Sequence, residues 1–441
     1  MSDIEHEHLT KEILARYFST TQSDEVARML LHLLAVCPEC REAGGAILAA
    51  YKAGAIGVQF SSVDVALFES RLKAEELWEV LKPLPYATAL RRIRRDRELM
   101  TWGLAELLAR ESRKVGSSDA ARAVELAILA VEVATRVPEW EPCEEEWLFE
   151  LRAFAYAHLV NAHRIACHMR DAEKAQKKAD EWWDKGKSMG DILGYEAEIV
   201  SIKAALRKDQ GRFEEALALL NDAERIYLAG DPESQDLHLA GRTLVLKAKT
   251  YELLGELERA LDTLREASPL IDPERDPRLL LCIQHNILNC LARVGRPEDA
   301  RAMLPRVRKL SEDLGNDLDL IRLSWTEGLL ADAADDGEKA AELLLSAQAE
   351  FVRRQMGYDA ALVSLDLAAV YLKEGRAAET AALAREMVPI FEAEDIHREA
   401  LAALAVFKEA ALRHRLSADL VSRVARYLEE ARTNPGLKFE E

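Results

Sequence analysis

The sequence has few of the residues that favour β-sheets and tight turns. Aromatic residues make up 6% of its 441 positions, and it contains only 20 glycines and 13 prolines. Leucine and alanine dominate its apolar half, whereas the β-branched and aromatic residues typical of strands are scarce. Because leucine and alanine are good helix formers, we predict an all-α fold.

Long apolar runs are absent as well. Runs such as residues 127–131 are far shorter than the roughly 20 apolar residues that a membrane helix needs. The N-terminus also lacks the basic and apolar regions of a signal peptide. We therefore expect a cytoplasmic protein that has no membrane partner.

Positive charge is in short supply. The formal net charge of −19 argues against binding to nucleic acid, because phosphate contacts need clustered cations. The strongest opposing signal is the arginine-rich stretch 91–97, which we interpret as the solvated face of a helix. Contact with DNA through residues 85–113 is the alternative interpretation.

Sequence motifs of known catalytic sites are missing. The chain has no nucleophile elbow, no phosphate-binding glycine loop, no dinucleotide fingerprint and no His-Glu-x-x-His. Three histidines, His158, His163 and His168, are spaced five apart, which spreads them around a helix instead of directing them to one metal ion. We predict that the protein is not an enzyme.

A six-residue motif recurs through the second half of the chain. It begins with a small residue and ends with alanine, most clearly in 211–216, 255–260 and 295–300. Its sixth position falls at residues 172, 216, 260, 300, 340 and 380, with spacings of 44, 44, 40, 40 and 40. This period predicts an α-solenoid, in which helical hairpins stack because one hairpin cannot bury its own apolar face.

The repeat resembles the tetratricopeptide family. In the third unit, Leu244, Ala248 and Tyr251 share one side of the first helix, and a glycine turn and alanines follow in the family's order. Pro273 closes this unit as the family's proline does. The usual period of the family is about 34 residues, so we expect each helix to be about one turn longer here.

This resemblance implies a superhelix whose groove binds a protein or peptide partner. Polar residues on the first helices are the candidates for that groove, since asparagines and basic side chains can hold a peptide backbone or carboxylate. The candidates are Asn161, Arg164, Arg242, Lys249, His285, Asn286, Asn289, Arg322 and Trp325.

The N-terminal segment carries a cluster of metal-ligand residue types. Cys37 and Cys40 follow His32 closely, and Pro38 should end the preceding helix and turn Cys37 back toward His32. Both thiols would then lie near a helix N-terminus, which favours thiolate. These ligands suit tetrahedral, structural Zn²⁺, with His8 as the fourth ligand.

Three points remain open at this cluster. His6 is the second choice for the fourth ligand. The Cys37-x-x-Cys40 pair could instead be a redox dithiol, or the cluster could be incidental. The other four cysteines stand singly in helical patterns, as small buried residues do.

The same segment resembles the zinc-binding anti-sigma domain of bacteria. The matching residues are His8-Leu-Thr, His32-Leu and Cys37-Pro-Glu-Cys-Arg, with four residues between His32 and Cys37 where that family usually has three. The resemblance implies a helical zinc module that contacts a sigma factor or another transcription component.

These patterns divide the chain into five parts and predict further helices at about 64–81, 85–113 and 118–137. The parts are a zinc module at 1–50, a linker or helix at 51–84, helical hairpins at 85–140, tetratricopeptide-like repeats at 141–392, and a capping hairpin with tail at 393–441. We predict a non-enzymatic bacterial regulator or adaptor that binds protein or peptide partners. The alternatives are a redox protein or other enzyme, and a DNA-binding regulator with a repeat sensor domain.

Overall fold

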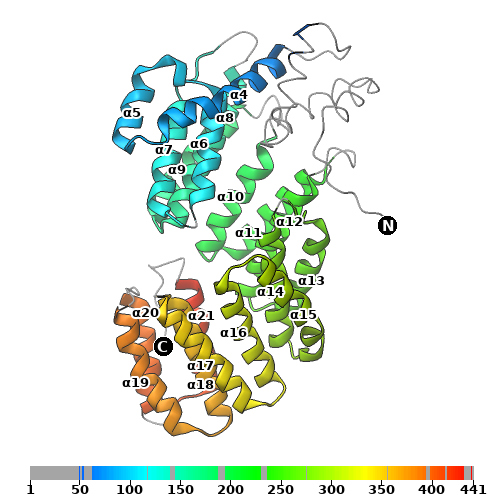
Figure 1. Ribbon diagram of the computed structural model, residues 1–441. Helices are drawn as coiled ribbons and strands as arrows, with labels where there is room; N and C mark the ends of the chain where they lie inside the picture. Colours follow the sequence, from blue (N-terminus) through cyan, green and yellow to red (C-terminus); the bar gives the residue numbers. More distant parts are fainter. Residues whose placement is uncertain are drawn as a thin grey trace. The chain divides into compact units, whose positions relative to one another are not determined.

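The computed structural model describes residues 62–431 except for 117, 140–144, 187–193, 230–235, 275, 355, 394–397 and 413–414, together with residues 49, 52–53 and 439. Every regular element among these residues is a helix, which confirms the predicted all-α class (Figure 1). The proposed zinc ligands His8, His32, Cys37 and Cys40 lie outside the described residues. No described helix is long and apolar enough to cross a membrane.

The chain forms two compact units. Unit 1 comprises residues up to Leu206 together with Ala229–Ser234, and unit 2 comprises Arg207–Leu228 and Gln235–Glu441. Unit 1 contains α4 (Ser62–Leu81), α5 (Tyr86–Arg95), the short 3-10 helix η1 (Arg97–Leu99), α6 (Trp102–Val115), α7 (Ala120–Ala134), α8 (Glu145–Ile165), α9 (Met169–Gly186) and most of α10 (Glu196–Asp209).

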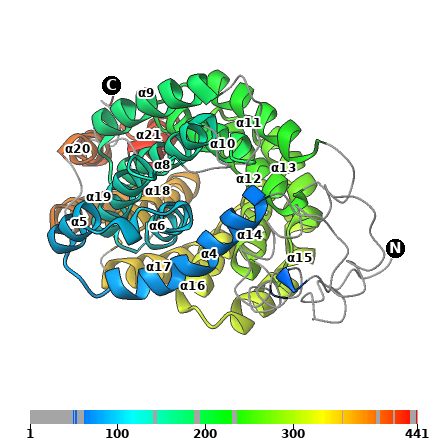
Figure 2. The ribbon, with the colours of Figure 1, turned by 90° about the horizontal axis from the view of Figure 1, so that it is seen from above.

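The core of unit 1 surrounds α6, which packs against α4, α7 and α8. Figure 2 shows α4 and α8 beside α6. A buried polar network sits within this apolar core. The Arg71 guanidinium on α4 donates two hydrogen bonds of 2.6 Å to the Glu106 carboxylate on α6. The Tyr195 hydroxyl also donates to Glu106, and the Trp102 indole donates to Tyr195 at 3.0 Å. The two opposite charges are therefore paired where both side chains are almost fully shielded from water.

One predicted helix is broken in the structure. The sequence pattern predicted a continuous helix over about 85–113, but α5 ends at Arg95 and α6 begins at Trp102. The Asp96 side chain accepts from the Glu98 N–H, and the Thr101 side chain accepts from the Leu104 N–H. Such side chains satisfy backbone donors locally and so compete with a continuing helix. The prediction of one helix here was wrong.

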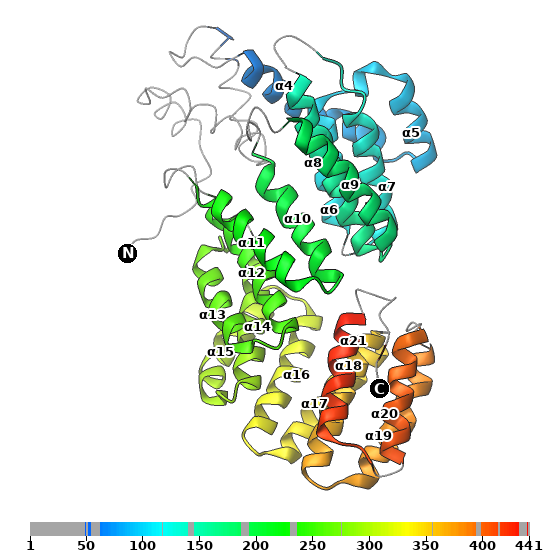
Figure 3. The same ribbon diagram turned by 180° about the vertical axis from the view of Figure 1, so that it is seen from behind.

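Unit 2 is a series of helical hairpins in which an even-numbered first helix precedes an odd-numbered second helix. Its helices are α11 (Phe213–Tyr227), α12 (Leu237–Leu253), α13 (Leu257–Ala267), the 3-10 turn η3 (Ser268–Leu270), α14 (Pro277–Arg293), α15 (Pro297–Asp313), α16 (Asp317–Ala333), α17 (Gly337–Arg353), α18 (Gly357–Lys373), α19 (Ala377–Ala393), α20 (Arg398–Leu412) and α21 (Ala418–Ala431). From α14 to α19 each helix has 17 residues and each connection has three, so one hairpin repeats every 40 residues. The last helix, α21, packs on α18 (Figure 3).

The recurring six-residue motif is the turn between the two helices of a hairpin. Its first residue has positive φ in all six copies, namely Cys167, Gly211, Gly255, Gly295, Asp335 and Gly375. In each copy the next N–H bonds back to a carbonyl five residues earlier, as Glu256 does to Tyr251 at 2.9 Å, which closes the helix in a Schellman motif. The sixth residue is at most 2% exposed in every copy, from Ala172 to Thr380. The repeat predicted from the sequence is confirmed.

Candidate partner-binding face

The structure places the nine predicted groove residues on first helices of both units. Asn161 and Arg164 lie on α8 in unit 1, where the Arg164 guanidinium donates to the Asn161 side-chain oxygen at 2.9 Å. The other seven lie in unit 2: Arg242 and Lys249 on α12, His285, Asn286 and Asn289 on α14, and Arg322 and Trp325 on α16.

The seven residues of unit 2 belong to a larger polar surface. On α14, Arg278, Cys282, His285, Asn289 and Arg293 follow one another at spacings of three or four residues, so they share one side of the helix. Leucines and isoleucines on the other sides of α14 form the core of unit 2.

Neighbouring first helices are joined by polar pairs at one constant sequence offset. The Arg293 guanidinium donates to Glu252 at 3.3 Å, and Arg278 donates to both carboxylate oxygens of Asp319 at 3.1 and 3.2 Å. Each pair is 41 residues apart, which is one repeat plus one residue. A third pair of the same offset, Trp325 with Asp366, links α16 to α18. We call the surface formed by these side chains the A-helix face, and it comprises Arg242, Lys249, Glu252, Arg278, Cys282, His285, Asn286, Asn289, Arg293, Asp319, Arg322, Trp325 and Asp366.

Charges of both signs are held close together on the A-helix face. The Lys249 ammonium lies 3.0 Å from the Glu252 carboxylate. Burial lowers the pKa of Lys249, but the carboxylates of Glu252 and of Glu429 on α21 outweigh burial, so the net pKa is raised. Lys249 therefore stays charged, and α21 contributes a carboxylate to the same electrostatic environment.

Two polar atoms of α14 lack partners on this face. Within the part of the chain that the structure describes, Nε2 of His285 and Oδ1 of Asn289 are buried and make no hydrogen bond. Burial lowers the pKa of His285 to about 4, so the ring is neutral at pH 7. Each unpaired buried polar group costs about 1–3 kcal/mol, which a ligand that bonds to it could recover.

Cys282 corrects one prediction from the sequence. Isolated cysteines were predicted to be small buried residues, and Cys290 is buried, but Cys282 is exposed. Asn286 Nδ2 lies 3.8 Å from the Cys282 sulfur. The surrounding helices desolvate the thiol and raise its pKa although solvent reaches it, so the thiol is the protonated form at neutral pH. Cys282 is thus an accessible but unactivated position on this face.

The histidines of α8 also differ from the prediction. They do not share one helix, because α8 ends at Ile165 and His168 follows the turn at Cys167. The His163 and His168 rings lie 5.8 Å apart, while the buried His158 lies 3.4 Å from Glu198. Among the described residues, no three His, Cys, Asp or Glu side chains are arranged to hold a metal ion.

The arginine-rich stretch 91–97 is partly neutralised within unit 1. Arg94 donates to both carboxylate oxygens of Glu132 at 2.9 and 3.1 Å, and Arg92 lies 4.0 Å from Asp96. Arg91 donates to the Ala87 carbonyl at 3.1 Å. This arrangement is that of a solvated helix surface with local partners.

Sequence reasoning missed most of the charged partners on the A-helix face. Glu252, Arg293, Asp319 and Asp366 looked like ordinary polar residues of amphipathic helices. The signal that could have found them is the repeat itself, because a partner is expected about one period away on the next first helix.

Proteins of known structure share the fold of this chain. No family model matches the chain, and no curated protein matches it in sequence. A Rap protein complexed with competence and sporulation factor matches with a TM-score of 0.54 and 13% identity over 75% of this chain and 88% of the Rap chain. The apo form of RapI matches with a TM-score of 0.52 and 15% identity over 75% of this chain and 87% of RapI. The chain therefore has a tetratricopeptide-like helical-repeat fold similar to that of Rap proteins.

Proposed function

We propose that the protein is a non-enzymatic regulator or adaptor that binds a protein or peptide partner on its A-helix face. The observation that carries this proposal is the pair of unsatisfied buried atoms, His285 Nε2 and Asn289 Oδ1, among charges from neighbouring first helices. Most buried polar groups in folded proteins have a hydrogen-bond partner, and these two unpaired atoms lie four residues apart on one side of α14, where one ligand could bond to both.

The chemistry of the A-helix face suits an extended polypeptide. Asn286, Asn289 and the neutral ring of His285 offer both donors and acceptors, which a peptide backbone requires. Cations and carboxylates alternate across the face, as in Lys249 with Glu252 and Arg278 with Asp319, so a polyanion such as nucleic acid would meet repulsion. A Rap protein of similar fold has been crystallised with a bound factor, which supports the use of this fold for ligand binding.

Site-specific crosslinking tests this function. A photo-reactive amino acid at the exposed position Cys282 should capture a partner from the source cell, and Asn289→Ala should abolish that capture. Asn221→Ala is the matched control, since Asn221 is exposed on the second helix α11, away from the A-helix face. Equal capture by both variants would contradict the proposal.

We also propose that residues 1–50 form a zinc-stapled module, with His8, His32, Cys37 and Cys40 as ligands, that contacts a sigma factor or another transcription component. Ligand spacing and the resemblance to the anti-sigma domain support this proposal, and both come from the sequence. Metal analysis of the full chain should find one zinc per chain, which Cys37→Ser or Cys40→Ser removes. Thiols that a mild oxidant converts to a disulfide would instead favour the redox alternative.

A further inference from the structure

The hairpin of α12 and α13 departs from the regular repeat of α14 to α19. Its second helix, α13, has 11 residues, whereas α15 and α17 have 17 each. The helix ends at Ala267, and Pro273, which the sequence suggested as the close of this unit, lies in the connection to α14. Pro269 has no N–H to continue the helical hydrogen bonds, and the chain tightens into η3 before it becomes extended at Ile271. Nine residues then connect α13 to α14 in place of three.

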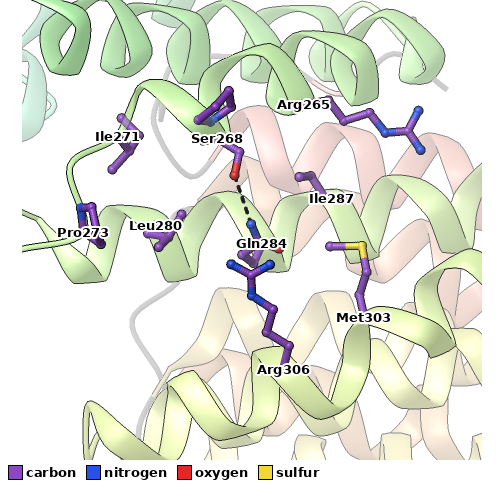
Figure 4. A pocket seen from close by; sticks show the side chains of 10 residues that line it. Arg265, Ser268, Ile271, Pro273, Leu280, Gln284, Ile287, Met303 and Arg306 are labelled. Carbon is purple, nitrogen blue, oxygen red and sulfur yellow. Dashed lines mark hydrogen bonds between the residues drawn. The ribbon is translucent and has the colours of Figure 1, made fainter. Parts of the chain in front are cut away.

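The shortened helix leaves a pocket of about 440 Å³ between α13, η3, α14 and α15, which opens to solvent (Figure 4). Leu280, Gln284 and Ile287 line it from α14 at spacings of four and three residues, so they share one side of that helix. Cys282 and His285 project from the opposite side of α14 by helical geometry. The pocket is therefore a site separate from the A-helix face.

An apolar wall and an oriented amide define the interior of this pocket. Leu280 and Ile287 from α14 and Met303 from α15 form the apolar part. The Gln284 side-chain nitrogen donates to the Ser268 hydroxyl at 3.1 Å, which fixes the amide and leaves its oxygen to accept a hydrogen bond. An apolar surface with one oriented acceptor suits a residue with an aliphatic side chain and a backbone N–H.

A single unpaired cation stands beside that amide. Its neighbours on α15 are paired, Arg301 with Glu298 at 2.6 Å and Arg308 with Glu327. Arg306 is exposed and has neither an ion pair nor a hydrogen bond within the described part of the chain. Figure 4 shows the Arg306 side chain directed toward Gln284, whereas the Arg265 guanidinium at the rim points away from it. In a chain of net charge −19, an arginine kept free at a pocket mouth is suited to an anionic ligand group.

We propose that this pocket binds the C-terminal residue of a partner polypeptide. The terminal carboxylate pairs with Arg306, the backbone N–H of that residue donates to the Gln284 oxygen, and its aliphatic side chain packs against Leu280, Ile287 and Met303. A fatty acid offers the carboxylate and the apolar group but no N–H for Gln284. The open side of the pocket lets the rest of a polypeptide leave, whereas it would leave much of a long acyl chain in water.

Methyl NMR on the full chain tests this proposal directly. The chain has eight methionines, and Met303→Leu identifies the Met303 methyl resonance in protein labelled with ¹³C-methyl methionine. The probe is a five-residue peptide of glycine and serine that ends in leucine with a free carboxylate. Titration to about 5 mM should shift the Met303 resonance in a saturable way, since one anchored residue gives affinities near the millimolar range.

Four comparisons decide the outcome. The same peptide with a C-terminal amide, and the free-acid peptide with Arg306→Gln, should each bind about tenfold more weakly. Arg308→Gln is the matched control on the same helix and should leave binding unchanged. Equal binding of acid and amide, or binding of octanoate without binding of the peptide, would overturn the proposal. Neither result depends on the A-helix face, so a failure of this proposal would not contradict partner binding on that face.

Discussion

The indole N–H of Trp325 on α16 donates a 2.7 Å hydrogen bond to the Asp366 carboxylate on α18, one repeat further along the chain. Burial raises the pKa of Asp366 from its ordinary 3.8 to about 7, although the Trp325 hydrogen bond acts in the opposite direction. Arg293 lowers this pKa, and the carboxylates of Glu429 and Asp332 raise it. The Asp366 carboxyl therefore titrates near neutral pH, and it lies on the face that we propose as the binding surface.

The first prediction concerns the pH dependence of stability. Between about pH 4 and pH 7 the folded chain holds a proton at Asp366 that the unfolded chain has lost, so stability should fall as pH rises through this window. Asp366→Asn keeps an acceptor for Trp325 but cannot titrate. In this variant the fall in the free energy of unfolding between pH 5 and pH 8 should be smaller by about 1–3 kcal/mol than in the parent chain, as measured by urea denaturation.

The control for that experiment is Asp262→Asn, because Asp262 is exposed on α13 and lies 3.5 Å from Arg265. It should leave the slope of stability against pH as it is in the parent chain. A slope that is the same for the parent and for Asp366→Asn would show that Asp366 titrates at its ordinary pKa.

The second prediction concerns the turn motif. Substitutions at two equivalent positions should change the stability of the fold in opposite directions. Gly295 and Asp335 occupy the same place in successive repeats, with φ of 73° and 60°. A Cβ at Gly295 would meet no atom within 4 Å, so Gly295→Ala should cost only the backbone strain of about 1–2 kcal/mol. Asp335→Gly should stabilise the fold by up to about 1 kcal/mol, because glycine adopts positive φ without strain. The loss of the ion pair between Asp335 and Lys373 reduces this gain. Thermal unfolding of both variants measures these changes in stability. If both variants were stabilised, or both destabilised, the two turn positions would not be equivalent.

The repeat was predictable because its signals are local. A residue with positive φ, as at Gly255, and a buried alanine five residues later, as at Ala260, are required by one turn and one contact. These requirements leave the same residue types at the same spacing in each copy. Sequence pattern alone therefore sufficed for the fold class and for the positions of most hairpins.

The pairs across helices were not predictable in the same way. In the sequence, Arg293 and Glu252 cannot be told from other solvated charged residues on amphipathic helices. Only the stacking of α12 on α14 brings their side chains to 3.3 Å. The residue at which α13 ends was not predicted either. Pro273 matched the family's closing position and lies in the connection to α14, but Pro269, four residues earlier, already removes a donor that the helix needs.

The third prediction concerns the buried pair of unit 1. Burial raises the pKa of Glu106, but Arg71 outweighs burial and holds the pKa at about 2. Glu106→Gln would leave the Arg71 charge buried without its partner, which should destabilise unit 1 by about 3–5 kcal/mol. Glu98→Gln on the exposed surface of η1 should change stability by less than about 0.5 kcal/mol.

The same pair sets an acid limit on unit 1. Because the folded pKa of Glu106 lies below its ordinary 4.5, its contribution to stability is present above that value and is lost as pH falls toward 2. The double variant Arg71→Met with Glu106→Leu should be less destabilised than Glu106→Gln and should lack this acid-sensitive part. Hydrogen exchange of α4 and α6 measures both effects, and equal acid sensitivity of the double variant would contradict them.

The fourth prediction compares two glycines in close helix contacts. The Gly103 N–H on α6 donates to the Ser70 hydroxyl on α4 at 2.9 Å, and a Cβ at Gly103 would lie 2.7 Å from Arg71 Cα. A Cβ at Gly328 on α16 would instead meet the end of the Leu344 side chain at 2.9 Å.

Backbone atoms cannot move aside without shifting a whole helix, whereas the Leu344 side chain can change rotamer. Gly103→Ala should therefore cost about 3 kcal/mol or more and separate α4 from α6, while Gly328→Ala should cost about 1 kcal/mol. Urea denaturation ranks the two variants, and protection of α4 amides from hydrogen exchange should fall only in Gly103→Ala. If Gly328→Ala were the more destabilised of the two, the contact between α4 and α6 would have to be looser than the bond from Gly103 to Ser70 implies.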